Sequence, residues 1–93
     1  MMYKEALVSV VIPVYNREDT IQRAVDSVLN QTYSNIEVLV VDDGSKDNSL
    51  EMLKKYHNDN RVKIFCQEFN QGANAARNRG IREAKGEYIA FHD

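Results

Sequence analysis

Two adjacent carboxylates, Asp42 and Asp43, follow an apolar run over residues 38–41 and precede Gly44, which turns the chain. A continuous apolar run is typical of a strand that is covered on both faces, as in a parallel sheet. Ligands of open parallel α/β sheets bind beyond the carboxyl ends of the strands, so acids placed there are suited to catalysis or ligand binding. The same Asp-Gly-Ser sequence also suits an ordinary turn and helix start, and the residue types alone leave both interpretations open.

The composition limits the kinds of protein that this chain can be. With 93 residues, of which 43% are hydrophobic, the sequence predicts one domain with a single core. Its formal charge of −2 argues against a nucleic-acid partner or a general anionic membrane surface. Cys66 is alone, which excludes an intramolecular disulfide and favours a core position. Because no signal peptide or apolar span is recognisable, we expect a cytoplasmic protein, with any attachment to the inner face of the membrane left to a missing C-terminal part.

Residues 8–14 form a second apolar run, mostly β-branched, which predicts the central strand of the sheet. Pro13 has no N–H to donate, so we expect ladder pairing to stop there. Asn16 and Asp19 have the spacing of a helix cap and its partner, which predicts a helix start at this point. An apolar stripe at helical period follows and is made of Ile21, Ala24, Val25, Val28 and Leu29.

The rest of the chain repeats this alternation of strands and helices. A second helical pattern follows Gly44, with Asp47 as its expected cap, and residues 62–66 alternate as an edge strand does. A third helix, near residues 73–85, has an inner face of small residues that should pack close to the sheet: Ala73, Ala76, Gly80, Ile81 and Ala84. Gly86 is the expected helix stop, and residues 87–91 are the fourth strand. The order βαβαβαβ predicts a parallel α/β sheet with helices on both faces.

Several motifs of nucleotide binding and catalysis are absent from the sequence. Neither Gly-x-Gly-x-x-Gly nor Gly-x-x-x-x-Gly-Lys-Ser/Thr occurs, which excludes the usual dinucleotide site and the P-loop. No Gly-x-Ser-x-Gly elbow occurs, and His57 and His92 lack the spacing of metal ligands. The sequence ends on Asp93, at the end of a strand where such a domain normally continues. We therefore expect residues 1–93 to be a single domain unit, the truncated N-terminal part of a larger domain.

Four sequence motifs occur in order along the chain. They are Val-Ile-Pro-Val-Tyr-Asn at residues 11–16, Val-Val-Asp-Asp-Gly-Ser at 40–45, Asn-Gln-Gly at 70–72 with Ala-Arg-Asn at 76–78, and Gly-Glu-Tyr-Ile-Ala-Phe-His-Asp at 86–93. Together they resemble the amino-terminal half of family 2 glycosyltransferases of the GT-A fold. The resemblance implies an open, mostly parallel sheet with strand order 3-2-1-4. It also implies that the carboxyl edge of this sheet holds a nucleotide-diphosphate sugar, usually a uridine one.

The resemblance assigns several of these residues to a pocket for the base. It implies that Asp43 accepts the N3–H of uracil, and that Asp42 supports the loop or the base pocket beside Gly44. Cytosine carries a lone pair at that position, and an unpaired buried acid costs about 1–3 kcal/mol, which is enough for discrimination between the two bases. The wall of the pocket would be formed by Pro13, Val14 and Tyr15.

Three further residues belong to the implied nucleotide site. Glu18 stands near enough in sequence to reach the same cleft, or equally serves as a first-turn acid of the helix. Arg77 would lie near the nucleotide, where a guanidinium binds acids or phosphate bidentately, with a surface salt bridge as the alternative. Asp93 would contact the ribose or a divalent ion, Mg²⁺ or Mn²⁺, that bridges the two phosphates. The second acid of the Asp-x-Asp motif and the catalytic base would lie after Asp93.

In the intact enzyme the resemblance implies a single displacement with inversion at the anomeric carbon. A downstream carboxylate would deprotonate the hydroxyl of a saccharide or lipid-linked acceptor. Because this chain lacks that base, we expect no transferase activity and at most weak nucleotide binding from it alone. We also expect an apolar face where the rest of the domain should pack, through which the chain could self-associate.

Two other functions remain open at this point. An acid pair at a strand end of a doubly wound sheet also occurs in receiver-like phosphoacceptor domains, where it binds Mg²⁺ beside a phosphorylated Asp. That function needs a third acid and a lysine after a later strand, and no such lysine is present. A non-catalytic module that binds nucleotide or assists assembly would keep the fold without the chemistry.

Overall fold

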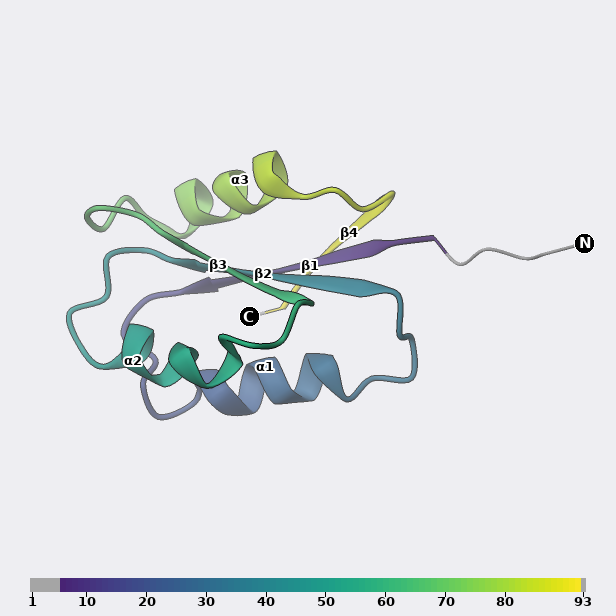
Figure 1. Cartoon of the computed structure of the whole chain (residues 1–93). Helices are drawn as coiled ribbons and strands as arrows, with labels where there is room; N and C mark the ends of the chain where they lie inside the picture. Colours follow the sequence, from purple (N-terminus) through teal and green to yellow (C-terminus); the bar gives the residue numbers. More distant parts are fainter. Residues whose placement is uncertain (1–5, 93) are drawn as a thin grey trace, which may run out of the picture.

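The computed structural model of the protein describes residues 6–92 and alternates strands with helices along the chain (Figure 1). The elements are β1 (Val8–Val14), α1 (Ile21–Leu29), β2 (Ile36–Asp42), α2 (Ser49–Leu53), the 3₁₀ turn η1 (Lys54–Tyr56), β3 (Val62–Cys66), α3 (Ala73–Glu83) and β4 (Tyr88–Phe91). The predicted order βαβαβαβ is therefore confirmed. None of these helices is long and apolar enough to cross a membrane.

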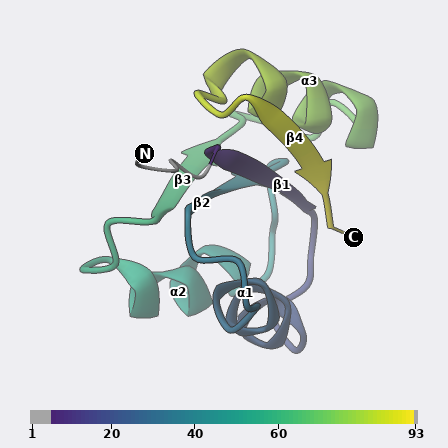
Figure 2. The ribbon, with the colours of Figure 1, turned by 90° about the vertical axis from the view of Figure 1, so that its right-hand side faces the viewer.

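The strands of the described residues form one parallel sheet in the order β3-β2-β1-β4. This is the predicted order 3-2-1-4, with β3 at one edge as its alternating pattern indicated. Helices α1 and α2 cover one face of the sheet and α3 covers the other, which is clearest when the sheet is viewed end on (Figure 2). All four residues of β4 are exposed, so the other edge carries an open apolar strand.

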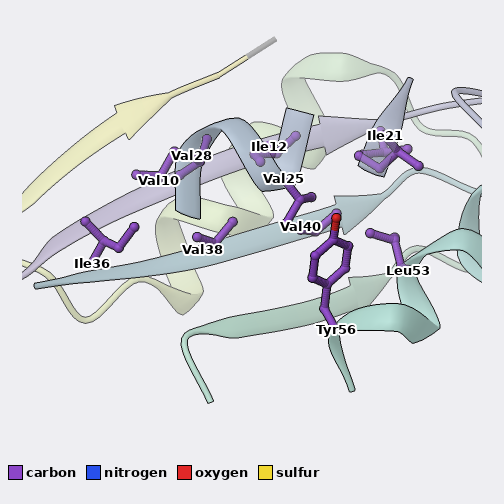
Figure 3. Close-up of a cluster of buried hydrophobic side chains, with 11 residues drawn as sticks. Val10, Ile12, Ile21, Val25, Val28, Ile36, Val38, Val40, Leu53 and Tyr56 are labelled. Atoms are coloured by element: carbon purple, nitrogen blue, oxygen red, sulfur yellow. The ribbon is translucent and has the colours of Figure 1, made fainter. Parts of the chain in front are cut away.

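The main core lies between the sheet and the α1 and α2 layer (Figure 3). Every residue of β2 is buried, as expected for a strand covered on both faces. The apolar stripe of α1 packs onto this face through Ile21, Val25 and Val28. Burial of each such side chain contributes about 1.5–3 kcal/mol, so the stripe holds α1 against β1 and β2.

Helix α3 packs against the other face through its smallest residues. Ala76 and Gly80 are buried, and a Cβ on Gly80 would lie 2.4 Å from Val11 Cγ1, so the predicted close packing is confirmed. The prediction that Ala73 and Ile81 belong to this face is wrong, because Ala73, the first residue of α3, is exposed and the side chain of Ile81 is 42% exposed. Ile81 lies about 100° around the helix from Gly80, so it cannot share the contact that Gly80 makes with the sheet.

Two helix boundaries differ from the sequence predictions. Helix α1 begins at Ile21, and Asn16 instead adopts a positive φ of 51° in the preceding loop, so the predicted start at Asn16 is wrong. Helix α3 ends at Glu83, and Gly86 is not its stop. A Cβ on Gly86 would lie 2.6 Å from Ser9 Oγ, so glycine is needed there for a close approach to β1.

Two smaller predictions about the strands need correction. Pairing of β1 with β4 ends at Val11, but pairing with β2 runs past Pro13 to Val14, so Pro13 ends the ladder on one side only. Cys66 is exposed rather than part of the core, because it lies at the end of an edge strand. The pKa of the Cys66 thiol is raised mainly by partial burial, and the negative charge of Asp42 raises it further.

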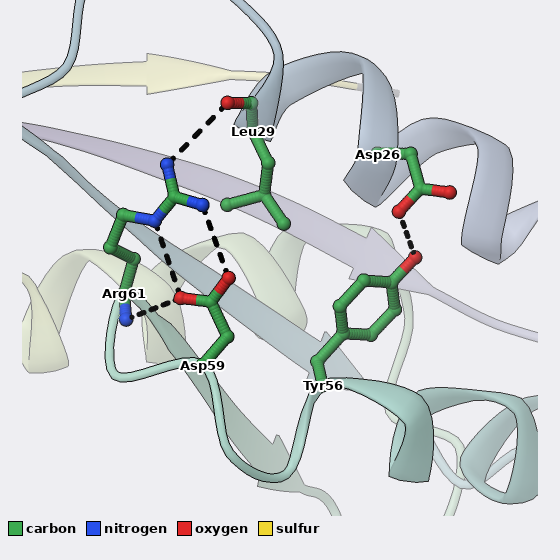
Figure 4. Close-up of polar contacts among 5 residues, drawn as sticks. All are labelled: Asp26, Leu29, Tyr56, Asp59 and Arg61. Carbon is green, nitrogen blue, oxygen red and sulfur yellow. Dashed lines mark hydrogen bonds and ion pairs between the residues drawn. The ribbon is translucent and has the colours of Figure 1, made fainter.

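Polar contacts join α1 to η1 and to the connection before β3 (Figure 4). The Tyr56 hydroxyl donates to Asp26 Oδ1 at 2.6 Å, and burial together with that carboxylate raises the pKa of Tyr56. Arg61, before β3, binds Asp59 at 3.1 Å and donates to the Leu29 carbonyl at the end of α1. These contacts therefore hold the α1 helix, the η1 turn and residues 59–61 together.

A buried acid fixes the connection between α3 and β4. Glu37 of β2 accepts hydrogen bonds from the Ser9 hydroxyl at 2.6 Å and the Lys85 N–H at 2.7 Å. The Ser9 oxygen in turn accepts the Gly86 N–H at 2.8 Å. Desolvation raises the pKa of Glu37, but the hydrogen bonds from Ser9 and Lys85 and the charge of Lys63 together lower it below its ordinary value.

Candidate functional site

The loops that follow β1 and β2 and the segment that leads into α3 meet at the carboxyl edge of the sheet. They enclose a cavity of about 370 Å³. Its lining residues are Pro13, Val14, Tyr15, Arg17, Asp43, Asn70, Gly72, Ala73, Ala76 and Arg77. Five residues that the sequence assigned to the nucleotide site, from three separate parts of the chain, therefore lie around one cavity. They are Pro13, Val14, Tyr15, Asp43 and Arg77.

Asp43 is the buried acid of this cavity, with only 3% of its surface exposed. Its Oδ1 accepts the Gln71 N–H at 2.9 Å and its Oδ2 accepts the Gly72 N–H at 2.8 Å. These two bonds fix the carboxylate against the start of α3. Each carboxylate oxygen has a second lone pair, so Asp43 can still accept a hydrogen bond from a ligand in the cavity.

Asp42 is the last residue of β2, directly before the following loop, and it does not line the same cavity. Its side chain is 1% exposed, and Oδ2 accepts the Ser45 N–H at 3.0 Å. Its Oδ1 is buried and has no hydrogen-bond partner among residues 6–92. With Gly44, Asp42 lines a separate cavity of about 460 Å³ between this loop and residues 67–70. The two adjacent acids therefore have different structural roles. Asp43 lines the first cavity, and Asp42 stabilises the turn after β2 through its bond from Ser45.

Gly44 allows the turn after β2 to pack against the segment before α3. Its φ is 72°, which favours glycine, and a Cβ would lie 2.6 Å from the Asn70 nitrogen and the Phe69 carbonyl carbon. No side chain fits there without moving the backbone of that segment. Gly44 thus brings Asp43 close to the residues that bind its carboxylate.

The remaining predicted residues occupy different places. Tyr15 is 36% exposed and lines both cavities, so its ring stands at the boundary between them. Arg77 reaches the first cavity from α3 and donates to Asn74 Oδ1 at 3.3 Å. Glu18 is partly buried in the loop before α1 and lines neither cavity. Asp93 lies outside the described residues.

Sequence reasoning gave no site role to five residues that line the cavity, which are Arg17, Asn70, Gly72, Ala73 and Ala76. Two of them, Arg17 and Asn70, have polar side chains that could bind a ligand. The guanidinium of Arg17 donates to the carbonyls of Tyr15 and Asn16, both at 3.2 Å, which places it at the rim of the cavity. Arg17 directly follows the first motif, and its positive charge beside a proposed nucleotide was a signal that could have been used. Asn70 belonged to the third motif but had received no role of its own.

A metal site is not formed by the residues that the structure describes. Within residues 6–92, no group of three His, Cys, Asp or Glu side chains is close enough together to hold a metal ion. The donor set of residues 6–92 therefore does not fit a divalent ion by itself.

The amino-acid sequence matches one family of known proteins over almost its whole length. The sequence model described as glycosyl transferase family 2 covers residues 9–93. The chain belongs to glycosyltransferase family 2. All four motifs that carry the resemblance lie within the matched residues, and the receiver-like interpretation is set aside.

Individual relatives and solved structures agree with this assignment. An uncharacterized glycosyltransferase of Haemophilus influenzae is 47% identical over 88 residues, which make up 94% of this chain and 35% of that protein. The Escherichia coli protein named UDP-Glc:alpha-D-GlcNAc-diphosphoundecaprenol beta-1,3-glucosyltransferase WfgD is 45% identical over 87 residues, or 94% of this chain and 34% of that protein. This chain thus spans about a third of the length of these two relatives.

Two solved structures share the fold. The chain superposes on Staphylococcus aureus TarS 1-349 in complex with UDP-GlcNAc with a TM-score of 0.83 and 36% identity, covering 90% of this chain and 25% of that one. It superposes on the mannosyltransferase PcManGT of Pyrobaculum calidifontis, in complex with GDP-Man and Mn²⁺, with a TM-score of 0.80 and 26% identity, covering 88% of this chain and 25% of that one. The predicted α/β fold of a GT-A glycosyltransferase is confirmed.

Proposed function

We propose that this chain is the nucleotide-sugar-binding part of a glycosyltransferase that uses a UDP-sugar as donor. The observation that carries the proposal is the cavity at the carboxyl edge of the sheet, where Tyr15, Asp43 and Arg77 lie together. The family to which the chain belongs supports transfer of a sugar as the reaction. A solved relative bound to UDP-GlcNAc and a relative named for a UDP-Glc donor support uridine as the nucleoside.

The chemistry of Asp43 favours uracil over cytosine. A carboxylate can accept the N3–H of uracil, whereas cytosine presents a lone pair at the same position and repels it. Leaving the buried acid without this donor costs about 1–3 kcal/mol, which corresponds to about a fivefold to 150-fold difference in affinity. The exposed ring of Tyr15 can stack on the base, a contact worth about 1–3 kcal/mol for any base.

Charge at the rim of the cavity suits the diphosphate. Arg77 on α3 and Arg17 on the loop after β1 both line the cavity, and a guanidinium can bind phosphate oxygens through two N–H groups at once. The base would then lie against Tyr15 and Asp43, with the phosphates toward the arginines. This orientation places the sugar away from the buried end of the cavity.

The rest of the reaction belongs to the whole protein. We expect an inverting displacement in which a carboxylate outside this chain deprotonates the acceptor hydroxyl. The acceptor is a saccharide or a lipid-linked saccharide, as the name of WfgD states for that relative. A divalent ion, Mg²⁺ or Mn²⁺, would bind through residues beyond those described and stabilise the leaving nucleoside diphosphate.

Titration with three nucleotides tests the proposed donor. UDP, CDP and GDP, each with Mn²⁺, are added separately to the purified chain in an isothermal titration calorimeter. UDP should bind at least about fivefold more tightly than CDP, because uracil has an N3–H to donate to Asp43 and cytosine has none. Equal binding of all three nucleotides would refute the proposal.

A second assay tests whether this chain binds the donor without catalysing transfer. Incubation of the purified chain with UDP-sugar and saccharide acceptors should give no transfer if, as we propose, the catalytic base belongs to another part of the protein. Measurable turnover would show that the chain holds catalytic groups that we have not assigned.

A further inference from the structure

The loop after β1 is bound to the segment after β2 by three consecutive backbone N–H groups. Asn16 donates to Ser45 Oγ at 2.9 Å, Arg17 to Ser49 Oγ at 2.7 Å, and Glu18 to Asp47 Oδ2 at 3.1 Å. A fourth bond runs in the opposite direction, from the Lys46 N–H to Asn16 Oδ1 at 2.9 Å. In the three bonds from the β1 loop, every acceptor is a side chain, so the attachment depends on the residue types after β2.

Asp47 and Ser49 form the centre of this attachment. The Ser49 hydroxyl is buried and donates to Asp47 Oδ1 at 2.6 Å, which directs its lone pairs toward the Arg17 N–H. Asp47 Oδ1 also accepts the Ser49 N–H at 2.9 Å, at the start of α2. Desolvation raises the pKa of Asp47, but these bonds and the one from Glu18 together lower it below its ordinary value.

The attached loop carries two residues of the nucleotide cavity. Tyr15 and Arg17 line that cavity, and Asn16 between them has a φ of 51°, a conformation that residues other than glycine rarely adopt. Bonds on both the N–H and the side chain of Asn16 hold it in this conformation. A loop fixed in this way loses less conformational entropy when ligand binds, so it raises affinity without touching the ligand.

We propose that Ser49 and Asp47 are positioning residues of the nucleotide site, which hold Tyr15 and Arg17 in place for a nucleoside diphosphate. The inference rests on the proposed binding of nucleotide. It adds two residues that line neither the cavity of Asp43 nor that of Asp42.

The variant Ser49→Ala tests the proposal, because it removes the acceptor for the Arg17 N–H and leaves the bond from the Ser49 N–H to Asp47 available. Ser9→Ala is the matched control. Ser9 is also a buried serine that donates to a carboxylate and accepts a backbone N–H, but it lies near the start of β1, away from the cavity. Asp47→Asn is a second variant that keeps the size of the side chain and removes its charge.

The measurements are UDP and CDP affinity by calorimetry and amide hydrogen exchange by NMR, with the folded state of each variant checked by circular dichroism. In Ser49→Ala, UDP affinity should fall about threefold to tenfold, the change that loss of one hydrogen bond produces. The ratio of UDP to CDP affinity should stay the same, because Asp43 is unchanged. Exchange of the Arg17 amide should become faster. Asp47→Asn should act in the same direction, and Ser9→Ala should bind UDP within about twofold of the wild type.

Affinity for UDP within about twofold of wild type in Ser49→Ala would overturn the proposal, and so would an equal loss in Ser9→Ala. If the wild-type chain binds no UDP, the proposed function itself fails. Amide exchange then still decides whether Ser49 positions the loop. Faster exchange of Arg17 in Ser49→Ala but not in Ser9→Ala supports the positioning role, and unchanged exchange contradicts it.

Discussion

Replacement of Asp43 by Asn separates two roles that the structure gives to one carboxylate. The carboxylate accepts the N–H groups of Gln71 and Gly72, one on each oxygen. Asn keeps one oxygen and presents an NH₂ group in place of the other, so one of these N–H groups loses its acceptor. Hydrogen bonds to charged groups contribute about 1.5–3 kcal/mol, and we therefore expect Asp43→Asn to lower the free energy of unfolding by about that amount.

The same substitution should change which base the site prefers. An Asn NH₂ group repels the uracil N3–H and can donate to the cytosine N3, so UDP affinity should fall while CDP affinity is kept or rises. We expect the ratio of UDP to CDP affinity to fall at least about fivefold, the lower end of a 1–3 kcal/mol discrimination. The ratio, unlike either affinity alone, is insensitive to a general loosening of the site.

The assay combines urea denaturation with calorimetric titration of UDP and CDP for wild type, Asp43→Asn and Asp59→Asn. Asp59 is a suitable control because it also accepts a backbone N–H, from Arg61 at 2.9 Å, in the connection before β3. Asp59→Asn should lower stability without changing the nucleotide ratio. An Asp43→Asn variant that loses UDP and CDP affinity equally would show that Asp43 only holds the start of α3, and our assignment of base recognition would be wrong.

Three further predictions follow from other parts of the fold. Gly80→Ala places a Cβ 2.4 Å from Val11 Cγ1. The cost of overpacking, about 1–3 kcal/mol, should outweigh the gain of about 1 kcal/mol in helix propensity, so the urea midpoint of unfolding should fall. An unchanged or higher midpoint would contradict the close packing of α3. The hydrogen bonds of Glu37 with Ser9 and Lys85 lower its pKa from the ordinary 4.5, so its contribution to stability is present above pH 4.5 and is lost as the pH falls through the lower folded value. Urea denaturation across this range should show a shallower pH dependence in Glu37→Gln, and an identical slope would contradict the assignment. Strand β4 is exposed along its whole length, and we expect self-association through it at high concentration, which a monomeric mass by light scattering would exclude.

The apolar patterns of the sequence predicted the elements that carry the site. The apolar runs at residues 8–14 and 38–41 are mostly β-branched. The sequence pattern alone was therefore enough to assign β1 and the centre of β2. The order of the strands came from the resemblance to a family, because periodicity does not determine which strands are neighbours. The position of Ile81 was predicted wrongly because Ile81 follows directly after the buried Gly80, and its apolar side chain suggested that it was buried as well.

The attachment between the loops could not be predicted in the same way. The helix cap expected at Asn16 fits the residue types, but Asn16 accepts the N–H of Lys46, thirty positions away in the chain. Bonds between side chains and a distant backbone have no period in the sequence, so the pattern Ser-Lys-Asp-Asn-Ser after Gly44 suggested only a turn and a cap. The predicted cap at Asp47 is also wrong, because Asn48 occupies the N-cap of α2. Asp47 Oδ1 nevertheless accepts the first N–H of that helix, from Ser49, which is the bond that the residue type suggested.

The most direct test of the account is to map where UDP binds on the chain. Two-dimensional NMR of ¹⁵N-labelled protein titrated with UDP and diamagnetic Mg²⁺ reports each backbone amide separately. We predict that the largest shifts occur at Tyr15, Asp43, Gly72 and Arg77, around the 370 Å³ cavity, with little change in β4. Shifts confined to other surfaces, or no shifts at saturating UDP, would contradict a nucleotide site at this edge of the sheet.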